Sequence, residues 1–229
     1  MRRRALAAVL LVLTACGGGG DDDAAEDDPI TPTTGNRDDA TYVADVNLRL
    51  SDFPTEWKST PVPAATSEAT EAGARALAGC MGRPPPEELR TAIAYSDDFS
   101  AQDTRRASSS VQLVQTDDLA KDDFAALRSD QALGCHKAQI DAEFARQLPP
   151  EASPQTAIER LELPQFAEET VAFRITATTL ERGAQVRRVI DLVFVRKGRA
   201  EAAANFLNVG SPFPAELQRT LLQRMVSRL

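Results

Sequence analysis

The chain has 229 residues, of which 42% are hydrophobic, so its composition suits one globular domain with a packed core. Acidic residues outnumber basic ones, 34 to 26, which gives a formal net charge of −8. A nucleic-acid-binding protein needs a basic face that displaces counterions from phosphates, so this balance argues against a nucleic-acid partner. An acidic surface also gains nothing from anionic lipid headgroups, and any membrane attachment must come from elsewhere.

The N-terminus has the pattern of a bacterial export signal. Three arginines at positions 2–4 precede an apolar run at 5–13, which is shorter than the roughly 20 residues that a transmembrane helix needs. The motif Leu-Thr-Ala-Cys then ends at Cys16 and resembles the lipobox of bacterial lipoproteins. We expect residues 1–15 to be removed as a signal peptide and Cys16 to carry a diacylglycerol. The alternative is an ordinary signal peptide with a chance cysteine.

Residues 16–40 are expected to be the lipidated cysteine and an acidic tether. Four glycines are followed by six acidic residues between positions 21 and 28, so the segment buries little apolar area and repels itself. A flexible coil of this length spans roughly 25–30 Å. The acidic run lacks the Asp-x-Asp-x-Asp-Gly pattern of a calcium loop, which favours a spacer. We expect the acyl chains on Cys16 to hold the protein at the outer face of the cytoplasmic membrane.

Two cysteines are left once Cys16 is lipidated. Cys80 and Cys135 form an even pair in an exported protein, where disulfides persist. Closing a loop of about 55 residues would stabilise the fold by roughly 4 kcal/mol. A redox or metal pair is the alternative, but the spacing is not Cys-x-x-Cys, and His136 adjoins Cys135 in poor geometry for a shared ion.

The first half of the domain is predicted to be mainly helical. We expect an extended lead-in at 42–63, a helix at 66–79, a strand at 108–116 and a helix at 117–147. Phe53 and Trp57 are expected to anchor the lead-in on the core. Gly82 and the prolines after it end the first helix, and Gly134 is a candidate break in the second.

The second half is predicted to be mainly strands. We expect strands at 169–178 and 186–195, a turn at Lys197-Gly198 and a helix that begins at Pro214. The first strand alternates, with Val171, Phe173, Ile175 and Ala177 on one face. The second is apolar on both sides, which is typical of a central strand. Residues 199–208 are ambiguous, because their alanines favour a helix and the preceding turn favours a strand. Leu217, Leu221, Leu222 and Met225 share one face of the final helix.

These elements predict an α+β fold at 41–229, a single domain with one mainly antiparallel sheet flanked by helices. The chain also resembles actinobacterial cell-envelope domains. The resemblance rests on the lipobox and acidic tether, Asp52-Phe53-Pro54 with Trp57, Gly79-Cys80, Ser108-Ser109-Ser110-Val111, Gly134-Cys135, Ile190-Asp191-Leu192-Val193, Val195-Arg196-Lys197-Gly198-Arg199 and the closing segment 221–229. Such domains include mycobacterial Lpq-type lipoproteins and the extracellular sensor domain of a mycobacterial serine/threonine kinase. The resemblance implies a Mog1/PsbP-like α/β sandwich and a non-catalytic envelope domain.

Catalytic chemistry finds little support in the sequence. With one histidine, His136, the chain cannot build a centre of two or three histidines, and it has no Gly-x-Ser-x-Gly elbow for a serine nucleophile. The serines at 108–110 are expected to begin a strand. The acidic pairs at 97–98, 117–118 and 122–123 are typical of solvated faces or helix starts. We therefore expect no catalytic residue, no metal and no cofactor.

Asp191 is the most unusual carboxylate, because it lies inside an otherwise apolar strand. A buried carboxylate needs a partner, and Arg174 and Arg188 are the candidates. We favour a structural ion pair over a ligand site.

Three functions remain open from the sequence. The leading hypothesis is a tethered binding or sensing domain for an envelope component or partner protein. The second is a carrier that holds a lipid or hydrophobic small molecule between sheet and helix. A hydrolase that uses carboxylates alone ranks last, since it would need two carboxylates about 5–10 Å apart in a cleft.

Overall fold

The computed structural model of the protein describes residues 37–102, 104–147, 154–181 and 183–229. The expected signal peptide, Cys16 and most of the expected tether lie outside the described residues. The helices are α1 (Arg37–Val46), α2 (Ala64–Cys80), α3 (Pro86–Leu89), α4 (Asp117–Leu127), α5 (Asp130–Gln147) and α6 (Ala215–Val226), with a short 3-10 helix, η1 (Leu50–Asp52). The strands are β1 (Lys58–Thr60), β2 (Arg90–Tyr95), β3 (Asp98–Ala101), β4 (Arg105–Val114), β5 (Gln155–Arg160), β6 (Glu169–Glu181), β7 (Ala184–Lys197) and β8 (Ala200–Val209).

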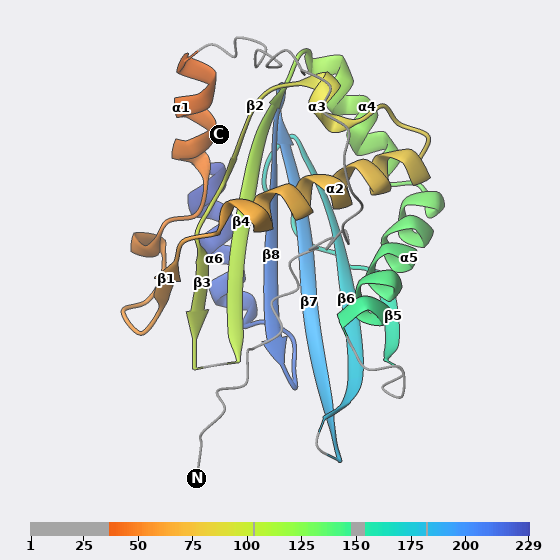
Figure 1. Cartoon of the computed structure of the whole chain (residues 1–229). Helices are drawn as coiled ribbons and strands as arrows, with labels where there is room; N and C mark the ends of the chain where they lie inside the picture. The colour runs from red at the N-terminus through yellow and green to blue at the C-terminus, as the bar shows by residue number, and fades with distance from the viewer. Residues whose placement is uncertain (1–36, 103, 148–153, 182) are drawn as a thin grey trace, which may run out of the picture.

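One antiparallel sheet organises the domain (Figure 1). Its strand order is β1-β3-β4-β8-β7-β6-β5, and β2 pairs with β4 beside β3. The long central strands β7 and β8 are joined by a tight turn at Gly198, whose φ of 56° lies in the left-handed region that glycine tolerates. The predicted α+β fold with a mainly antiparallel sheet is confirmed.

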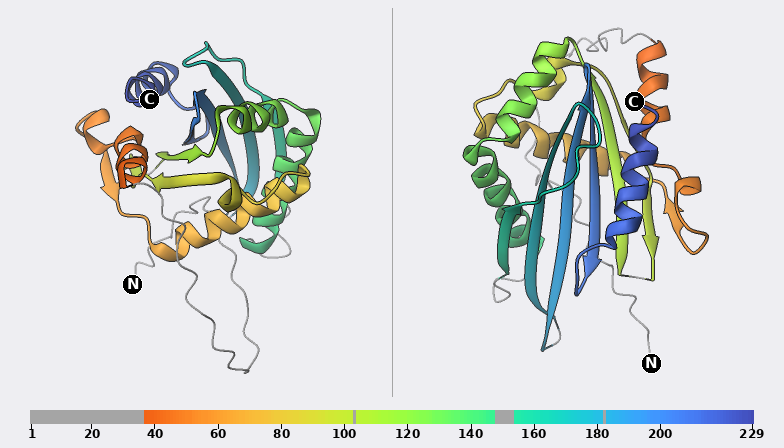
Figure 2. Two further views of the ribbon diagram at one scale, coloured as in Figure 1. Left: turned by 90° about the horizontal axis from the view of Figure 1, so that it is seen from above. Right: turned by 180° about the vertical axis from the view of Figure 1, so that it is seen from behind.

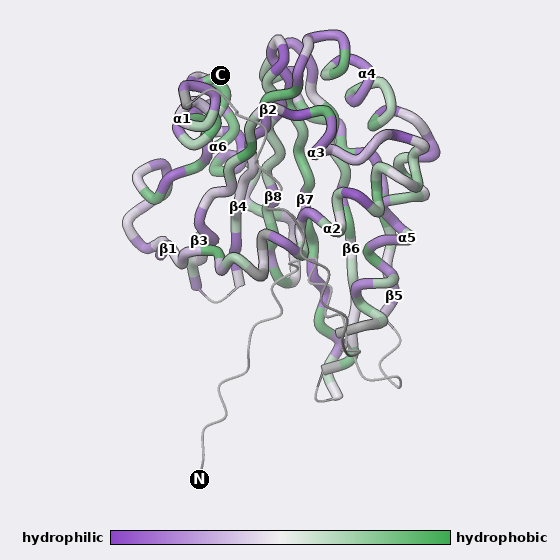
Figure 3. The backbone as a smooth tube through the Cα atoms, turned by 45° about the horizontal axis from the view of Figure 1, so that its top comes forward, coloured by the Kyte–Doolittle hydropathy of each residue, from purple (hydrophilic) through white to green (hydrophobic). Residues whose placement is uncertain are grey.

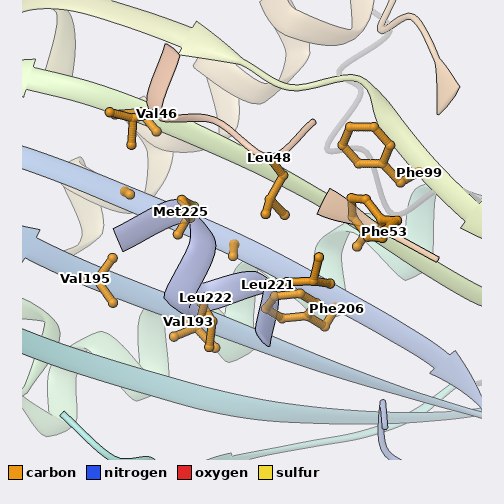
Figure 4. Close-up of a cluster of buried hydrophobic side chains, with 14 of the residues drawn as sticks. Val46, Leu48, Phe53, Phe99, Val193, Val195, Phe206, Leu221, Leu222 and Met225 are labelled. Atoms are coloured by element: carbon orange, nitrogen blue, oxygen red, sulfur yellow. The ribbon is translucent and has the colours of Figure 1, made fainter. Parts of the chain in front are cut away.

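The first face of the sheet is covered by α1 and α6 (Figure 2). Leu221, Leu222 and Met225 of α6 are completely buried. They belong to one hydrophobic cluster with Phe206 of β8 and Phe53 of the lead-in, and Figure 4 shows these side chains between helix and strands. We call this side the packed face.

The opposite face is covered by α2, α4 and α5, and α2 runs across the strands (Figure 1). Smaller clusters hold this side together: Ile140 and Phe144 of α5 pack against β6 and β7, and Phe124 of α4 packs near Phe173. In Figure 3 these helices alternate between hydrophilic and hydrophobic residues, as expected for helices with one buried side. We call this side the hollow face, for the cavity described below.

Several predicted elements are confirmed with small shifts of their ends. The first predicted helix is α2, the strand at 108–116 is β4, and the strands at 169–178 and 186–195 are β6 and β7. Pro214 directly precedes α6, and Phe53 and Trp57 are buried anchors as expected. The ambiguous segment 199–208 is the strand β8, whose alanines are small enough to lie beneath α6.

Other expectations are corrected. Residues 42–46 are helical and not extended, and α1 includes residues 37–40, which the sequence assigned to the tether. Asp39 explains this start, because its carboxylate accepts hydrogen bonds from Thr91 Oγ1 at 2.8 Å and from the Arg199 guanidinium at 2.8 Å. The break in the long helix falls at 128–129 and not at Gly134, since Ser129 Oγ accepts from the Ala132 amide and caps α5.

Candidate functional site

A cavity of about 300 Å³ lies between the sheet and α2 on the hollow face. Its floor comes from β4, β6, β7 and β8, its roof from α2 and one wall from α5. Small residues on both sides leave this space unfilled: Gly73 and Ala74 of α2, and Ala203 of β8. The volume is at the lower end of the range of small-molecule sites, which occupy roughly 300–1,000 Å³.

The strand register divides the floor into an apolar and a polar half. Alternate residues of a strand share a face, so Ile190, Leu192 and Phe194 of β7 line the cavity together. Strand β4, which pairs with β8 on the edge away from β7, contributes the hydroxyl groups of Ser108 and Ser110. The cavity therefore suits a molecule that is mostly apolar and carries some polar atoms.

The serines at 108–110 lie in β4, as expected, but they divide between the two faces of the sheet. Ser109 points to the packed face, where its Oγ donates to Asn47 Oδ1 at 2.7 Å and accepts from the Leu48 amide at 3.0 Å. Ser108 and Ser110 line the cavity. The serine run alone did not predict this role, although neighbouring residues of a strand point to opposite faces of the sheet.

His136 forms part of the cavity wall on α5. Its side chain is buried and packs against Phe173 and Phe194, with ring centroids 5.1 and 6.0 Å away. Burial lowers the pKa of His136 to about 4, so the imidazole is neutral at neutral pH. The imidazole is therefore a neutral hydrogen-bonding group in an otherwise apolar wall.

One corner of the cavity carries opposite charges. Asp98 of β3 and Arg106 of β4 both line it. Burial raises the pKa of the Asp98 carboxyl, while the positive charge of Arg106 acts in the opposite direction. The pair adds no net charge to this corner, so it does not favour an anion over a cation.

The disulfide joins the roof of the cavity to its wall. Cys80 at the end of α2 and Cys135 of α5 are bonded, with their Cα atoms 5.8 Å apart. Farther along the two helices, Gln139 Nε2 donates to the backbone carbonyl of Gly73 at 2.9 Å. Both contacts hold α2 over the cavity, and the Cys80–Cys135 disulfide is the pairing expected from the sequence.

Asp191 lies on the packed face, away from the cavity. Its two carboxylate oxygens accept hydrogen bonds from Arg174 at 2.7 and 2.8 Å, and Gln218 of α6 donates to it at 3.2 Å. Arg188, the other candidate partner, donates to Thr179 at 3.0 Å. A structural ion pair accounts for Asp191.

The described part of the chain contains no group of three or more His, Cys, Asp and Glu side chains that could hold a metal ion. None of its described helices is long and apolar enough to cross a membrane.

Comparison with known proteins finds similarity in structure alone. No family model and no curated protein matches the chain. The extracellular domain of PknH from Mycobacterium tuberculosis matches with a TM-score of 0.33 and 8% identity, over 59% of this chain and 62% of that domain, which is slightly less than two thirds of it. LpqN, which is involved in cell envelope biogenesis of the same organism, matches with a TM-score of 0.30 and 13% identity, over 77% of this chain and 75% of LpqN.

A protein of unknown function from Pseudomonas aeruginosa, PA94, also matches, with a TM-score of 0.21 and 16% identity over 56% of this chain and 71% of PA94. Two of these three structures come from a mycobacterium, as do the domains that the sequence motifs resemble. Because all three TM-scores are below 0.5, we base its function on the cavity and not on these neighbours.

Proposed function

We propose that this protein is a non-catalytic lipoprotein domain of the bacterial cell envelope that binds an apolar small molecule or acyl chain beneath α2. The acyl chains on Cys16 would hold it at the outer face of the cytoplasmic membrane, where such ligands are abundant. The observation that carries the proposal is the cavity, which is about 300 Å³ in volume and lined on one side by Ile190, Leu192 and Phe194. Of the hypotheses open from the sequence, this favours the carrier of a lipid or hydrophobic molecule.

The energetics of burial support an apolar ligand. Each methylene group that moves from water into an apolar site contributes about 0.8 kcal/mol. A chain of several carbons on this floor would therefore bind with useful affinity, provided that α2 is already in place. The disulfide and the bond from Gln139 to Gly73 hold α2 there, which reduces the ordering cost of binding.

The surface gives less support to a partner protein as the main ligand. Stable protein interfaces have an apolar centre, usually with large side chains. Among the described residues, only Leu50 and Leu180 are large hydrophobic side chains that are well exposed. They belong to different elements, η1 and β6.

Native mass spectrometry of the protein extracted from its host membranes tests the proposal. We expect an apolar molecule to copurify with the wild type and to be lost from Ala203→Phe, which places a ring in the cavity. The matched control is Ala125→Phe, on an exposed position of α4, and it should keep the ligand. A wild-type protein without any bound molecule, or one whose ligand survives Ala203→Phe, would refute the proposed site.

The anchor needs a separate test. Metabolic labelling with a fatty acid should mark the wild type and not Cys16→Ala, and only the wild type should have its leader removed. A wild-type protein that takes no label would contradict lipidation at Cys16, whatever the cavity binds.

A further inference from the structure

Four buried side-chain polar atoms in the described part of the chain have no hydrogen-bond partner: Trp57 Nε1, His136 Nε2, Glu201 Oε1 and Asn205 Oδ1. Two of these residues, His136 and Asn205, line the same cavity. Buried polar atoms are nearly always hydrogen-bonded in folded proteins, because leaving one unpaired forfeits its hydration. Two such residues at one cavity leave hydrogen bonds that a bound molecule can complete.

The two atoms belong to different walls. Asn205 lies on β8 between Ser108 of β4 and Leu192 of β7 in the strand register, so it marks the boundary between the polar and apolar halves of the floor. His136 belongs to α5 and is in ring contact with Phe194, which pairs with Ala203, two residues from Asn205 on the same strand face.

We propose that the cavity selects an apolar ligand that carries a hydroxyl group, with His136 Nε2–H donating to the hydroxyl oxygen and the hydroxyl donating to Asn205 Oδ1. This inference rests on the proposed function and names its ligand class. A hydroxyl group combines a donor with an acceptor, as one imidazole N–H and one amide oxygen together require. Both protein groups are neutral, so neither favours a carboxylate or an ammonium group.

Two isomers test the inference: decan-1-ol and 1-methoxynonane have the same atoms, but only the alcohol can donate a hydrogen bond. Their binding to the full chain with Cys16→Ser, which avoids detergent, is measured by calorimetry. We expect the alcohol to bind about tenfold more tightly than the ether, because the ether leaves Asn205 Oδ1 unpaired. Equal affinities would overturn the inference and leave the proposed function standing. Binding of neither isomer would overturn both.

Variants then assign the preference to residues. His136→Phe and Asn205→Leu both approximate the original side-chain shape. Asn205→Leu removes the acceptor that only the alcohol can use, so it should bring the alcohol-to-ether ratio close to one and keep ether affinity within about threefold, because the apolar contacts remain. His136→Phe removes the donor to the oxygen atom that both isomers carry, so it should weaken both isomers about equally and leave the ratio unchanged. Thr70→Val is the matched control, since Thr70 lines the cavity but already donates to the Thr66 carbonyl at 2.9 Å. It should leave the ratio and both affinities unchanged. A ratio that persists in Asn205→Leu, or an affinity for both isomers that is unchanged in His136→Phe, would refute the assignment, and if one variant does not fold, the other and the wild-type ratio still decide.

Discussion

Strand β8 shows how the two faces of the sheet differ: Ala204 and Phe206 point toward α6, and Ala203 and Asn205, which alternate with them, point toward α2. The first pair belongs to a continuous hydrophobic cluster that α6 fills with three fully buried side chains. The second pair borders a cavity. The same strand thus supports a face that is filled and a face that holds space open.

The packed face is expected to contribute mainly to folding stability, and the hollow face mainly to binding. Close packing maximises burial of apolar area and dispersion contacts, so the packed face should supply most of the folding stability. A cavity lacks these contacts, so the face that carries the binding site should contribute less to stability. Substitutions that are matched across the sheet can test this.

Truncation of a leucine should lower the free energy of unfolding much more on the packed face than on the hollow face. Leu222→Ala removes a completely buried side chain from α6 and should lower the free energy of unfolding by about 4 kcal/mol. Leu192→Ala removes a side chain that is only partly buried beside the cavity and should cost about 2 kcal/mol. Urea denaturation of both variants measures the difference. Equal losses would mean that the hollow face is as tightly packed as the other.

The disulfide should matter for the hollow face above all. Replacing Cys80 and Cys135 together by alanine opens a loop of 55 residues and should lower stability by about 4 kcal/mol. Hydrogen exchange should rise first in α2, because the disulfide holds its end to α5. Faster exchange that begins in α6 instead would contradict this local role.

The buried ion pair tests the packed face by electrostatics. Asp191→Asn leaves the Arg174 guanidinium without its carboxylate partner and should lower the free energy of unfolding by about 3 kcal/mol. Because Asp191 lies across the sheet from the cavity, binding of decan-1-ol should not change. A loss of binding with stability unaffected would instead make Asp191 part of a ligand site.

Acid should weaken the hollow face through His136. Its folded-state pKa of about 4 is below the ordinary value of 6.5. Between these two pH values, His136 is protonated in the unfolded chain and neutral in the folded one. Stability from this residue is complete above pH 6.5 and is lost as the pH falls toward 4, by about 3 kcal/mol. Denaturation of the wild type and His136→Phe at pH 7 and pH 4 isolates the effect. A constant difference between the two proteins would show that the histidine titrates normally.

The sequence predicts elements well where one strand or helix carries its own pattern. The alternation of β6, the apolar run of β7, and Pro214 before the leucines of α6 all identify their elements without tertiary information. Strands β2 and β3 were missed, because they are short and gain their stability from pairing with β4. The start of α1 could not be predicted for a similar reason, because Asp39 is bonded to Arg199, which is 160 residues away in the sequence.

The candidate site is harder to predict for a related reason. A cavity depends on the gap between α2 and the sheet, which follows from small residues at positions far apart in sequence, such as Gly73 and Ala203. His136 attracted notice as the one histidine of the chain, but nothing local indicates that it forms a wall with Asn205. Two unpaired polar atoms become visible as a pair only in the folded protein.

The smallest expected effect concerns how α2 is held over the cavity, and two glutamines of α5 offer a matched pair. Gln139 Nε2 donates to the carbonyl of Gly73 at 2.9 Å, and Gln131 Nε2 donates to that of Cys80 at 2.8 Å. Each bond should contribute only about 1 kcal/mol to stability. Gln139→Ala frees the middle of α2 and should speed ligand release severalfold, as stopped-flow displacement of decan-1-ol would show. Gln131→Ala should leave that rate unchanged, because the disulfide already fixes its end of the helix. If both variants released ligand at the wild-type rate, the entrance to the cavity would lie away from α2.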